Sequence, residues 1–170
     1  MIIAVVVAVT TTAMIMFILF GAFVLQFVLG FLGIPAAVSN WIASLGLSKL
    51  QVVLLICFVY LVLGTFMEEL SMIITTIPVL LPMLKTLQID LVWFGVIVVI
   101  LVQAAMISPP VGVNLFILHG LRNRLSGRNL PISDVFIGVM PFFLAMIVTL
   151  VLIIAFPQIA MWLVGISQAK

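Results

Sequence analysis

The sequence predicts an all-α protein that passes through a membrane several times. Of its 170 residues, 67% are hydrophobic and only 6% are charged, and the mean hydropathy is +1.61. Soluble domains carry about a quarter charged residues, so a lipid bilayer is the only solvent that suits this composition. Two short polar stretches, 64–71 and 107–112, interrupt the apolar runs. Irregular backbone inside a membrane must be buried in protein or line an aqueous cavity, so these stretches predict a re-entrant helical hairpin and a broken transmembrane helix.

The first apolar run predicts a spanning helix over residues 4–30. It contains no charge and is long enough to cross a bilayer with some tilt. It lacks the basic start of a signal peptide and is far longer than the apolar core of one, so we assign it to the mature protein. Residues 31–48 follow, with Gly33 and Pro35 as helix breakers and Trp41 as a membrane-interface anchor. They predict an interfacial segment, made of a loop and a short amphipathic helix.

Residues 49–87 predict the re-entrant hairpin. Two apolar arms, each shorter than the roughly 20 residues that a crossing needs, surround the polar stretch 64–71. The tip of the hairpin is then expected near the middle of the bilayer. The alternative is two complete crossings, with Glu68 and Glu69 at the start of a helix at the membrane interface, where carboxylates favour the helix dipole.

Residues 91–121 predict the broken helix. Pro109 and Pro110 remove two backbone donors and disfavour helical geometry at the residue before them. Gly112 permits a tight backbone path after the prolines. A last spanning helix is predicted over residues 135–164.

The charged residues predict the orientation of the chain. The loop 122–134 holds three of the six basic residues and is therefore expected on the cytoplasmic side. The N-terminus is then cytoplasmic, and the hairpin opens to the outside in spite of Lys49 and Lys85 at its mouth. Asp90 and Asp134 are expected to cap the helices that follow them.

The two polar stretches favour a secondary transporter. In such carriers half-helix N-termini attract anionic substrates, whereas unwound carbonyls and half-helix C-termini coordinate Na⁺. At the break, the carbonyls of residues 103–107 are expected to lose their helical donors, and the hydroxyl of Ser108 lies beside them. A simple proline kink is the alternative. Two prolines, a serine and a glycine beside a second polar stretch favour a binding site instead.

The tip of the hairpin supplies further ligands for a predicted Na⁺ site. A carboxylate at the bilayer centre costs about 2.5–3.5 kcal/mol on insertion scales, so Glu68 is expected to be functional. Thr65, Ser71 and the carbonyl of Gly64 complete a shell of hard oxygen ligands of the kind that Na⁺ accepts. No cofactor is predicted beyond this coupling ion.

Much of the chain also resembles one family. The resemblance is carried by three stretches, "LGTFMEELSMIITTIPVLLPMLKTLQID", "FGVIVVILVQAAMISPPVGVNLFIL" and "MPFFLAMIVTLVLIIAFPQIAMWL". They are similar to the C-terminal part of the large membrane subunit of tripartite ATP-independent periplasmic (TRAP) transporters. The most specific features are the P-x-x-x-P pattern of Pro78 and Pro82 and the S-P-P-V-G block at 108–112.

This resemblance implies a fold and a mechanism. The chain would be one inverted-repeat half of an elevator-type transporter in the cytoplasmic (inner) membrane of a bacterium or archaeon. The transporter would couple inward Na⁺ flow to the uptake of organic acids such as C4-dicarboxylates or sialic-acid-like carboxylates. A periplasmic substrate-binding protein would deliver the substrate, and a small TRAP membrane subunit would pack against the large one. Neither an enzymatic activity nor a nucleic-acid partner is expected.

The resemblance also implies roles for particular residues. The tip 64–71 and its partner loop 107–112 would form one Na⁺ site, and neighbouring groups would line the organic-acid pocket. The expected Na⁺ ligands are Gly64, Thr65, Glu68, Ser71, Ile107, Ser108 and Gly112. The expected substrate-binding residues are Thr75, Thr76, Pro109, Pro110 and Asn114. Ser108 stands where threonine is usual and keeps the hydroxyl, whereas Gln88 stands where glycine is common.

The sequence also admits other interpretations. Only one inverted repeat fits in 170 residues, so we expect either the C-terminal fragment of a longer permease or one half of a split permease. The alternatives are another Na⁺/dicarboxylate carrier of related hairpin design and a non-transporting membrane scaffold or assembly subunit. An intramembrane protease is disfavoured, because the sequence has no G-x-S-x-G motif and its aspartates lie at helix boundaries.

Overall fold

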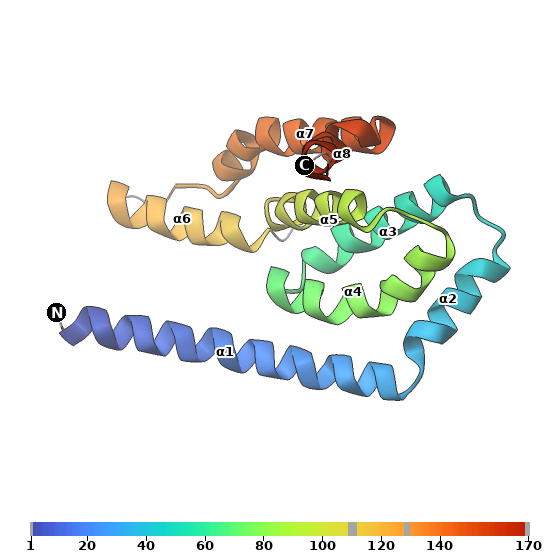
Figure 1. Cartoon of the computed structure of the whole chain (residues 1–170). Helices are drawn as coiled ribbons and strands as arrows, with labels where there is room; N and C mark the ends of the chain where they lie inside the picture. The colour runs from blue at the N-terminus through green and yellow to red at the C-terminus, as the bar shows by residue number, and fades with distance from the viewer. Residues whose placement is uncertain (1, 109–111, 128–129, 169–170) are drawn as a thin grey trace. The chain divides into compact units, whose positions relative to one another are not determined.

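The computed structural model describes residues 2–108, 112–127 and 130–168, and every regular element in these ranges is an α-helix (Figure 1). The all-α class is therefore confirmed for the described part of the chain. The helices are α1 (Ile2–Phe31), α2 (Ile34–Ser44), α3 (Lys49–Gly64), α4 (Glu69–Thr86), α5 (Leu91–Met106), α6 (Val113–Ser126), α7 (Ser133–Ala155) and α8 (Pro157–Gln168). Helices α1, α4 and α7 are long and apolar enough to cross a membrane, and α3 and α5 are shorter apolar helices.

The helices form two compact units, each assembled from two separate stretches of sequence. The first unit combines Met1–Ser48 with Glu68–Gln88 and contains α1, α2 and α4. The second combines Lys49–Met67 with Ile89–Lys170 and contains α3 and α5 to α8. The two predicted arms of the hairpin, α3 and α4, therefore belong to different units. The re-entrant geometry stays a prediction.

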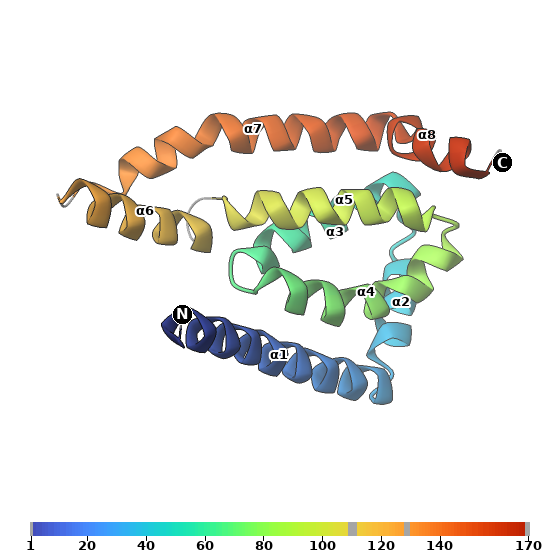
Figure 2. The ribbon, with the colours of Figure 1, turned by 60° about the vertical axis from the view of Figure 1, so that its left-hand side comes forward.

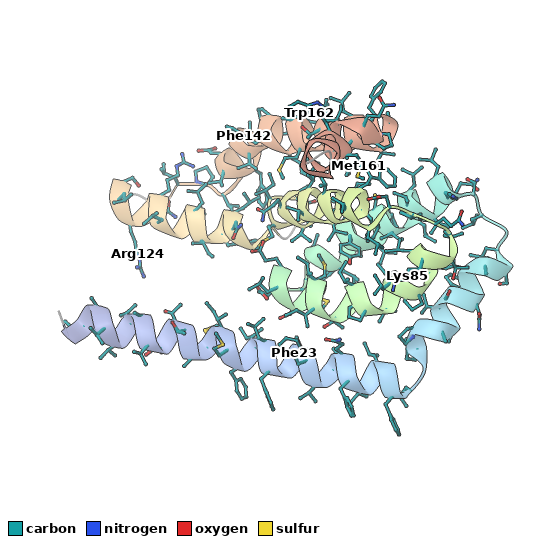
Figure 3. All side chains as sticks on the ribbon, viewed as in Figure 1. Phe23, Lys85, Arg124, Phe142, Met161 and Trp162 are labelled. Carbon is teal, nitrogen blue, oxygen red and sulfur yellow. The ribbon has the colours of Figure 1, made fainter. Side chains whose placement is uncertain are left out.

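In the first unit, the long helix α1 contacts α4 and α2. In both views of the ribbon α4 runs beside α1 (Figures 1 and 2). One face of α1 carries its less exposed side chains, at a spacing of three or four residues: Ile18, Leu19, Ala22, Gln26 and Leu29. The opposite face carries a row of exposed phenylalanines: Phe17, Phe20, Phe23, Phe27 and Phe31. Phe23, one of these phenylalanines, is 56% exposed (Figure 3).

Helix α4 is longer than the arm that the sequence predicts. It has 18 residues and reaches the length and hydropathy of a complete span. Pro78 and Pro82 lie inside it, where each removes one backbone donor, yet the helix continues past both. After the helix ends, Gln88 has φ +53°, a left-handed conformation that glycine adopts with far less strain.

Helix α5 is the centre of the second unit. It contacts α3, α7 and α8, and α7 runs alongside it (Figure 2). Its buried residues are Phe94, Ile97, Val98, Leu101, Val102, Ala104 and Ala105. Helices α6 and α7 also contact each other, through an edge-to-face pair of Phe116 and Phe136 with ring centroids 6.4 Å apart.

Of the two predicted helix caps, Asp90 and Asp134, the structure confirms only the first. Asp90 caps α5 as expected, because its Oδ1 accepts from the backbone N–H groups of Val92 and Trp93, both at 2.9 Å. Asp134 lies in the first turn of α7, but its side chain caps no backbone group. Its Oδ2 instead accepts from Nη2 of Arg122 at 3.0 Å, which ties the end of α6 to the start of α7. The prediction for Asp134 is therefore wrong.

The last apolar segment also differs from its prediction. The sequence predicts one helix over residues 135–164, but α7 ends at Ala155 and α8 begins at Pro157. Phe156 has φ −125° and ψ 76°, which lies outside the helical region. The physical cause is Pro157, because its ring disfavours helical geometry in the preceding residue and it has no N–H to continue the ladder.

Candidate functional site

The first half of the predicted tip closes α3 in a tight turn. Gly64 is the last residue of α3, and Thr65 follows it with only 9% of its surface exposed. The hydroxyl of Thr65 donates to the carbonyl of Val62 at 2.7 Å. A hydroxyl that donates its proton keeps lone pairs on the oxygen, so this side chain can still serve as a cation ligand.

The second half of the tip begins α4 with an acidic cap. Glu68 is the N-cap residue, in an extended conformation, and its Oε2 accepts from the backbone N–H of Ser71 at 2.9 Å. The hydroxyl of Ser71 donates to the same oxygen at 3.1 Å. The structure therefore brings these two predicted ligands together. The carboxylate satisfies an orphan donor of the first turn and also complements the positive end of the helix dipole.

The break after α5 is tighter than the sequence predicts. The N–H of Ile107 donates to the carbonyl of Ala104 at 3.3 Å, and that of Ser108 donates to the carbonyl of Ala105 at 3.1 Å. These bonds span three residues, as in a 3₁₀ turn, and they occupy two of the five carbonyls expected to be free. The carbonyl of Met106 lacks a helical donor for a covalent reason, because the residue four positions later is Pro110.

Gly112 makes the turn that starts α6. Its N–H donates to the carbonyl of Ser108 at 3.0 Å. A Cβ at this position would lie 3.0 Å from that same oxygen and 3.0 Å from Cδ1 of Leu115, which is closer than side chains normally pack. Gly112 is thus required by close approach of the backbone. Pro109 and Pro110, predicted as substrate-binding residues, lie outside the described residues.

The other predicted substrate-binding residues lie on two helices. Thr75 and Thr76 are on α4, in the first unit; Thr75 is buried, and the hydroxyl of Thr76 donates to the carbonyl of Met72 at 2.7 Å. Asn114 is exposed in the first turn of α6, in the second unit. Its Nδ2 lies 4.0 Å from Sδ of Met106, on the other side of the break.

Trp93 has no role among the predictions from sequence. Its indole Nε1–H donates to the carbonyl of Ile153 at 2.8 Å, and this bond joins α5 to the end of α7. A signal was present in the sequence. Pro157 leaves the carbonyl four residues earlier without a donor, and an indole is a donor that needs a partner when buried.

Three described helices that are long and apolar enough to cross a membrane, in a chain with few charges, define a multi-pass membrane protein. Residues 2–159 match the sequence profile described as "Tripartite ATP-independent periplasmic transporter, DctM component". The chain therefore belongs to the family of large permease subunits of TRAP transporters, which are transport proteins and not enzymes. This family works with a substrate-binding protein and a small membrane subunit.

Individual relatives carry several substrate names. The chain is 32% identical over 150 residues to the C4-dicarboxylate TRAP transporter large permease protein DctM of Rhodobacter capsulatus, covering 88% of this chain and 33% of the relative. It is 36% identical over 112 residues to the sialic acid TRAP transporter permease protein SiaT of Haemophilus influenzae, covering 66% and 17%. It is 32% identical over 132 residues to the isethionate TRAP transporter permease protein DctMQ of Oleidesulfovibrio alaskensis, covering 78% and 20%. The chain spans about a third or less of the length of these relatives.

Proposed function

We propose that this chain is the C-terminal part of a TRAP permease and that it carries one of the Na⁺ sites that drive uptake of an organic anion. The observation that carries this proposal is the break between α5 and α6. There an apolar helix stops in a 3₁₀ turn, the Met106 carbonyl has no helical donor, and Gly112 restarts a second half-helix within six residues of Met106. Unwound carbonyls of this kind coordinate Na⁺ in secondary transporters.

The proposed Na⁺ ligands are oxygen atoms from both polar stretches. At the break they are the backbone carbonyls of Met106 and Ile107 and the hydroxyl of Ser108, held by the turn at Gly112. At the tip they are the carbonyl of Gly64, the hydroxyls of Thr65 and Ser71 and the carboxylate of Glu68. The bonds of the Glu68 cap engage Oε2, so Oε1 is the oxygen that we assign to the ion.

The proposed substrate is an organic anion. The relatives are named for C4-dicarboxylates, sialic acid and isethionate, which share a carboxylate or a sulfonate group. The positive N-terminal end of α6 suits such a group. Asn114 offers an amide donor there, close in sequence to Pro109 and Pro110, and Thr75 and Thr76 offer hydroxyl groups on α4. No arginine lies in the apolar segments, so dipoles and neutral donors must carry the recognition within this chain.

The proposal includes the arrangement of the whole transporter. Helices α3 and α4 form a re-entrant hairpin, and this chain is one inverted-repeat half of an elevator in a bacterial or archaeal inner membrane. The periplasmic binding protein delivers the anion, and the small subunit packs against the permease. Helix α4 alone is long enough for a complete crossing, so cysteine accessibility at Thr65 from each side of the membrane distinguishes a hairpin from two crossings.

The function can be tested in proteoliposomes that contain the permease and its small subunit, supplied with the binding protein. Uptake of labelled C4-dicarboxylate, sialic acid and isethionate is measured with and without an inward Na⁺ gradient. We expect uptake of at least one of these anions to require Na⁺. Ser108→Ala should raise the Na⁺ concentration for half-maximal uptake several-fold, because a hydroxyl ligand is lost.

Glu68→Gln separates the two roles of the carboxylate. The amide oxygen still accepts from the N–H of Ser71, so the cap survives, but the charge that attracts the cation is removed. We expect weaker Na⁺ dependence with only a small fall in melting temperature, because the lost charge also favours the helix dipole. Glu69→Gln removes the same charge one residue later, and Ser44→Ala removes a hydroxyl from α2; both serve as controls. An unchanged Na⁺ requirement in Ser108→Ala and Glu68→Gln would rule out this site.

A further inference from the structure

The division of the last apolar segment leaves one backbone carbonyl without its helical donor. In an uninterrupted helix the N–H of residue 157 would donate to the carbonyl of Ile153. Residue 157 is a proline and has no N–H to donate. Ile153 is only 8% exposed, so solvent is a poor substitute, and a buried carbonyl without a partner carries a desolvation cost.

A tryptophan on a different helix supplies the missing donor. The indole Nε1–H of Trp93 lies 2.8 Å from the carbonyl oxygen of Ile153, across 60 residues of sequence. Trp93 is itself fixed at the start of α5, where its backbone N–H donates to Oδ1 of Asp90 at 2.9 Å. Helix α8 contacts both α5 and α7. This hydrogen bond therefore joins the start of α5 to the last turn of α7.

The other two tryptophans have different surroundings. Trp41 on α2 is 60% exposed. Trp162 on α8 is 68% exposed (Figure 3). Exposed rings of this kind suit a membrane interface. Trp93 is half-buried, and its indole is directed to a main-chain oxygen rather than to the surface. The pairing of Trp93 with the carbonyl that Pro157 frees thus sets this tryptophan apart from the other two.

We propose that Trp93 is a positioning residue that fixes the corner between α7 and α8 to the start of α5. A proline break alone would act as a hinge, because the helical bonds that hold the two segments in line are missing. The hydrogen bond from Trp93 satisfies the carbonyl of Ile153 and makes the corner between α7 and α8 rigid instead of flexible.

A double-mutant cycle tests the proposal in the purified permease. Trp93→Phe keeps an aromatic ring but removes the donor, and we expect a fall of about 2–4 °C in melting temperature. Pro157→Ala restores a backbone N–H, so the Ile153 carbonyl no longer depends on the indole. In the Pro157→Ala background, Trp93→Phe should therefore cost less than half as much.

Matched controls separate the hydrogen bond from loss of packing. Pro141→Ala also restores a backbone N–H in α7, but far from Trp93, and it should leave the cost of Trp93→Phe unchanged. Trp41→Phe and Trp162→Phe should leave the melting temperature nearly unchanged. If Trp93→Phe costs the same in the parent protein and in the Pro157→Ala background, the ring acts only by packing, and the proposed corner is wrong.

A second measurement needs no substitution at the corner. In protein labelled with ¹⁵N at the indoles, the Trp93 Nε1 proton should exchange with solvent about tenfold more slowly than those of Trp41 and Trp162. The Trp41→Phe and Trp162→Phe variants assign their own two signals, and a Trp93→Tyr variant assigns that of Trp93. Exchange of the Trp93 proton as fast as that of the other two would overturn the proposal, even if Trp93→Phe fails to fold.

Discussion

Helices α1 and α5 are both apolar and free of charge, yet their environments are opposite. In α1 only Ala22 is buried among residues 3–31. In α5 the side chains of Leu101, Ala104 and Ala105 are 0% exposed. Lipid tails are as apolar as leucine, so hydrophobicity does not decide which helix of a membrane protein faces lipid and which forms the core.

What differs between the two helices is the size and placement of side chains. The outer face of α1 carries phenylalanines, of which Phe17 and Phe31 are 78% and 84% exposed. The C-terminal end of α5 carries Ala104 and Ala105, and small residues let neighbouring backbones approach closely. Packing inside this chain therefore depends on how well side chains fit together, whereas the exposed apolar side chains of α1 suit contact with lipid.

The largest expected effect distinguishes the two helices directly. Leu101→Ala in α5 should lower the free energy of unfolding by about 2–5 kcal/mol, because it leaves a cavity in a packed core. Leu25→Ala in α1, where the side chain is 44% exposed, should cost less than about 1 kcal/mol because lipid or detergent fills the space. Unfolding by sodium dodecyl sulfate in mixed micelles, followed by circular dichroism, measures both. Equal costs in the two variants would show that α1 and α5 do not differ in how tightly their side chains are packed.

The next effect concerns two glycines. Gly112→Ala places a methyl group 3.0 Å from the Ser108 carbonyl, and we expect a cost of about 1–3 kcal/mol together with reduced uptake. Gly21→Ala on α1 meets nothing within 4 Å and should leave stability unchanged or slightly raised. The same unfolding assay and the uptake assay report both variants. A Gly112→Ala variant as stable and active as the parent would show that the break tolerates side chains.

The smallest effect concerns the end of α4, the helix that α1 packs against. Gln88 holds a left-handed conformation, so Gln88→Gly should raise the free energy of unfolding by about 1 kcal/mol. Gln88→Ala is the control, since alanine keeps the Cβ that causes the strain. A similar gain in the alanine variant would mean that the amide side chain, and not the backbone, carries the cost.

The sequence predicts much of the fold because the membrane imposes its own pattern. Long uncharged runs predict α1 and α7, and Asp90 predicts the start of α5. The end of α7 at Ala155 is not predicted, although Pro157 marks it, because the apolar run continues unchanged beyond the proline. The sequence also does not predict that α3 and α4 belong to different units. A local residue pattern does not indicate which distant helix a given helix will contact.

The sequence predicts only part of the candidate site. The prolines and Gly112 locate the break, and Gly112 proves to be required by close approach of the backbone. The carbonyls of Ala104 and Ala105 accept hydrogen bonds in a 3₁₀ turn. The backbone dihedral angles that form this turn cannot be deduced from the residue types alone. Glu68 and Ser71 illustrate a second limit, because one carboxylate is suited both to capping a helix and to binding a cation.

The assignment of α3 and α4 to different units has a consequence for the order of assembly at the ribosome. When α4 emerges, its contact partners α1 and α2 have already been synthesised. Helix α3 precedes α4 in the chain but contacts α5, whose last residue, Met106, follows Gly64 by 42 positions (106 minus 64). At about 5–20 residues per second, that wait lasts roughly 2–8 s. The first unit can thus close during translation while α3 stays in contact with the insertion machinery or lipid.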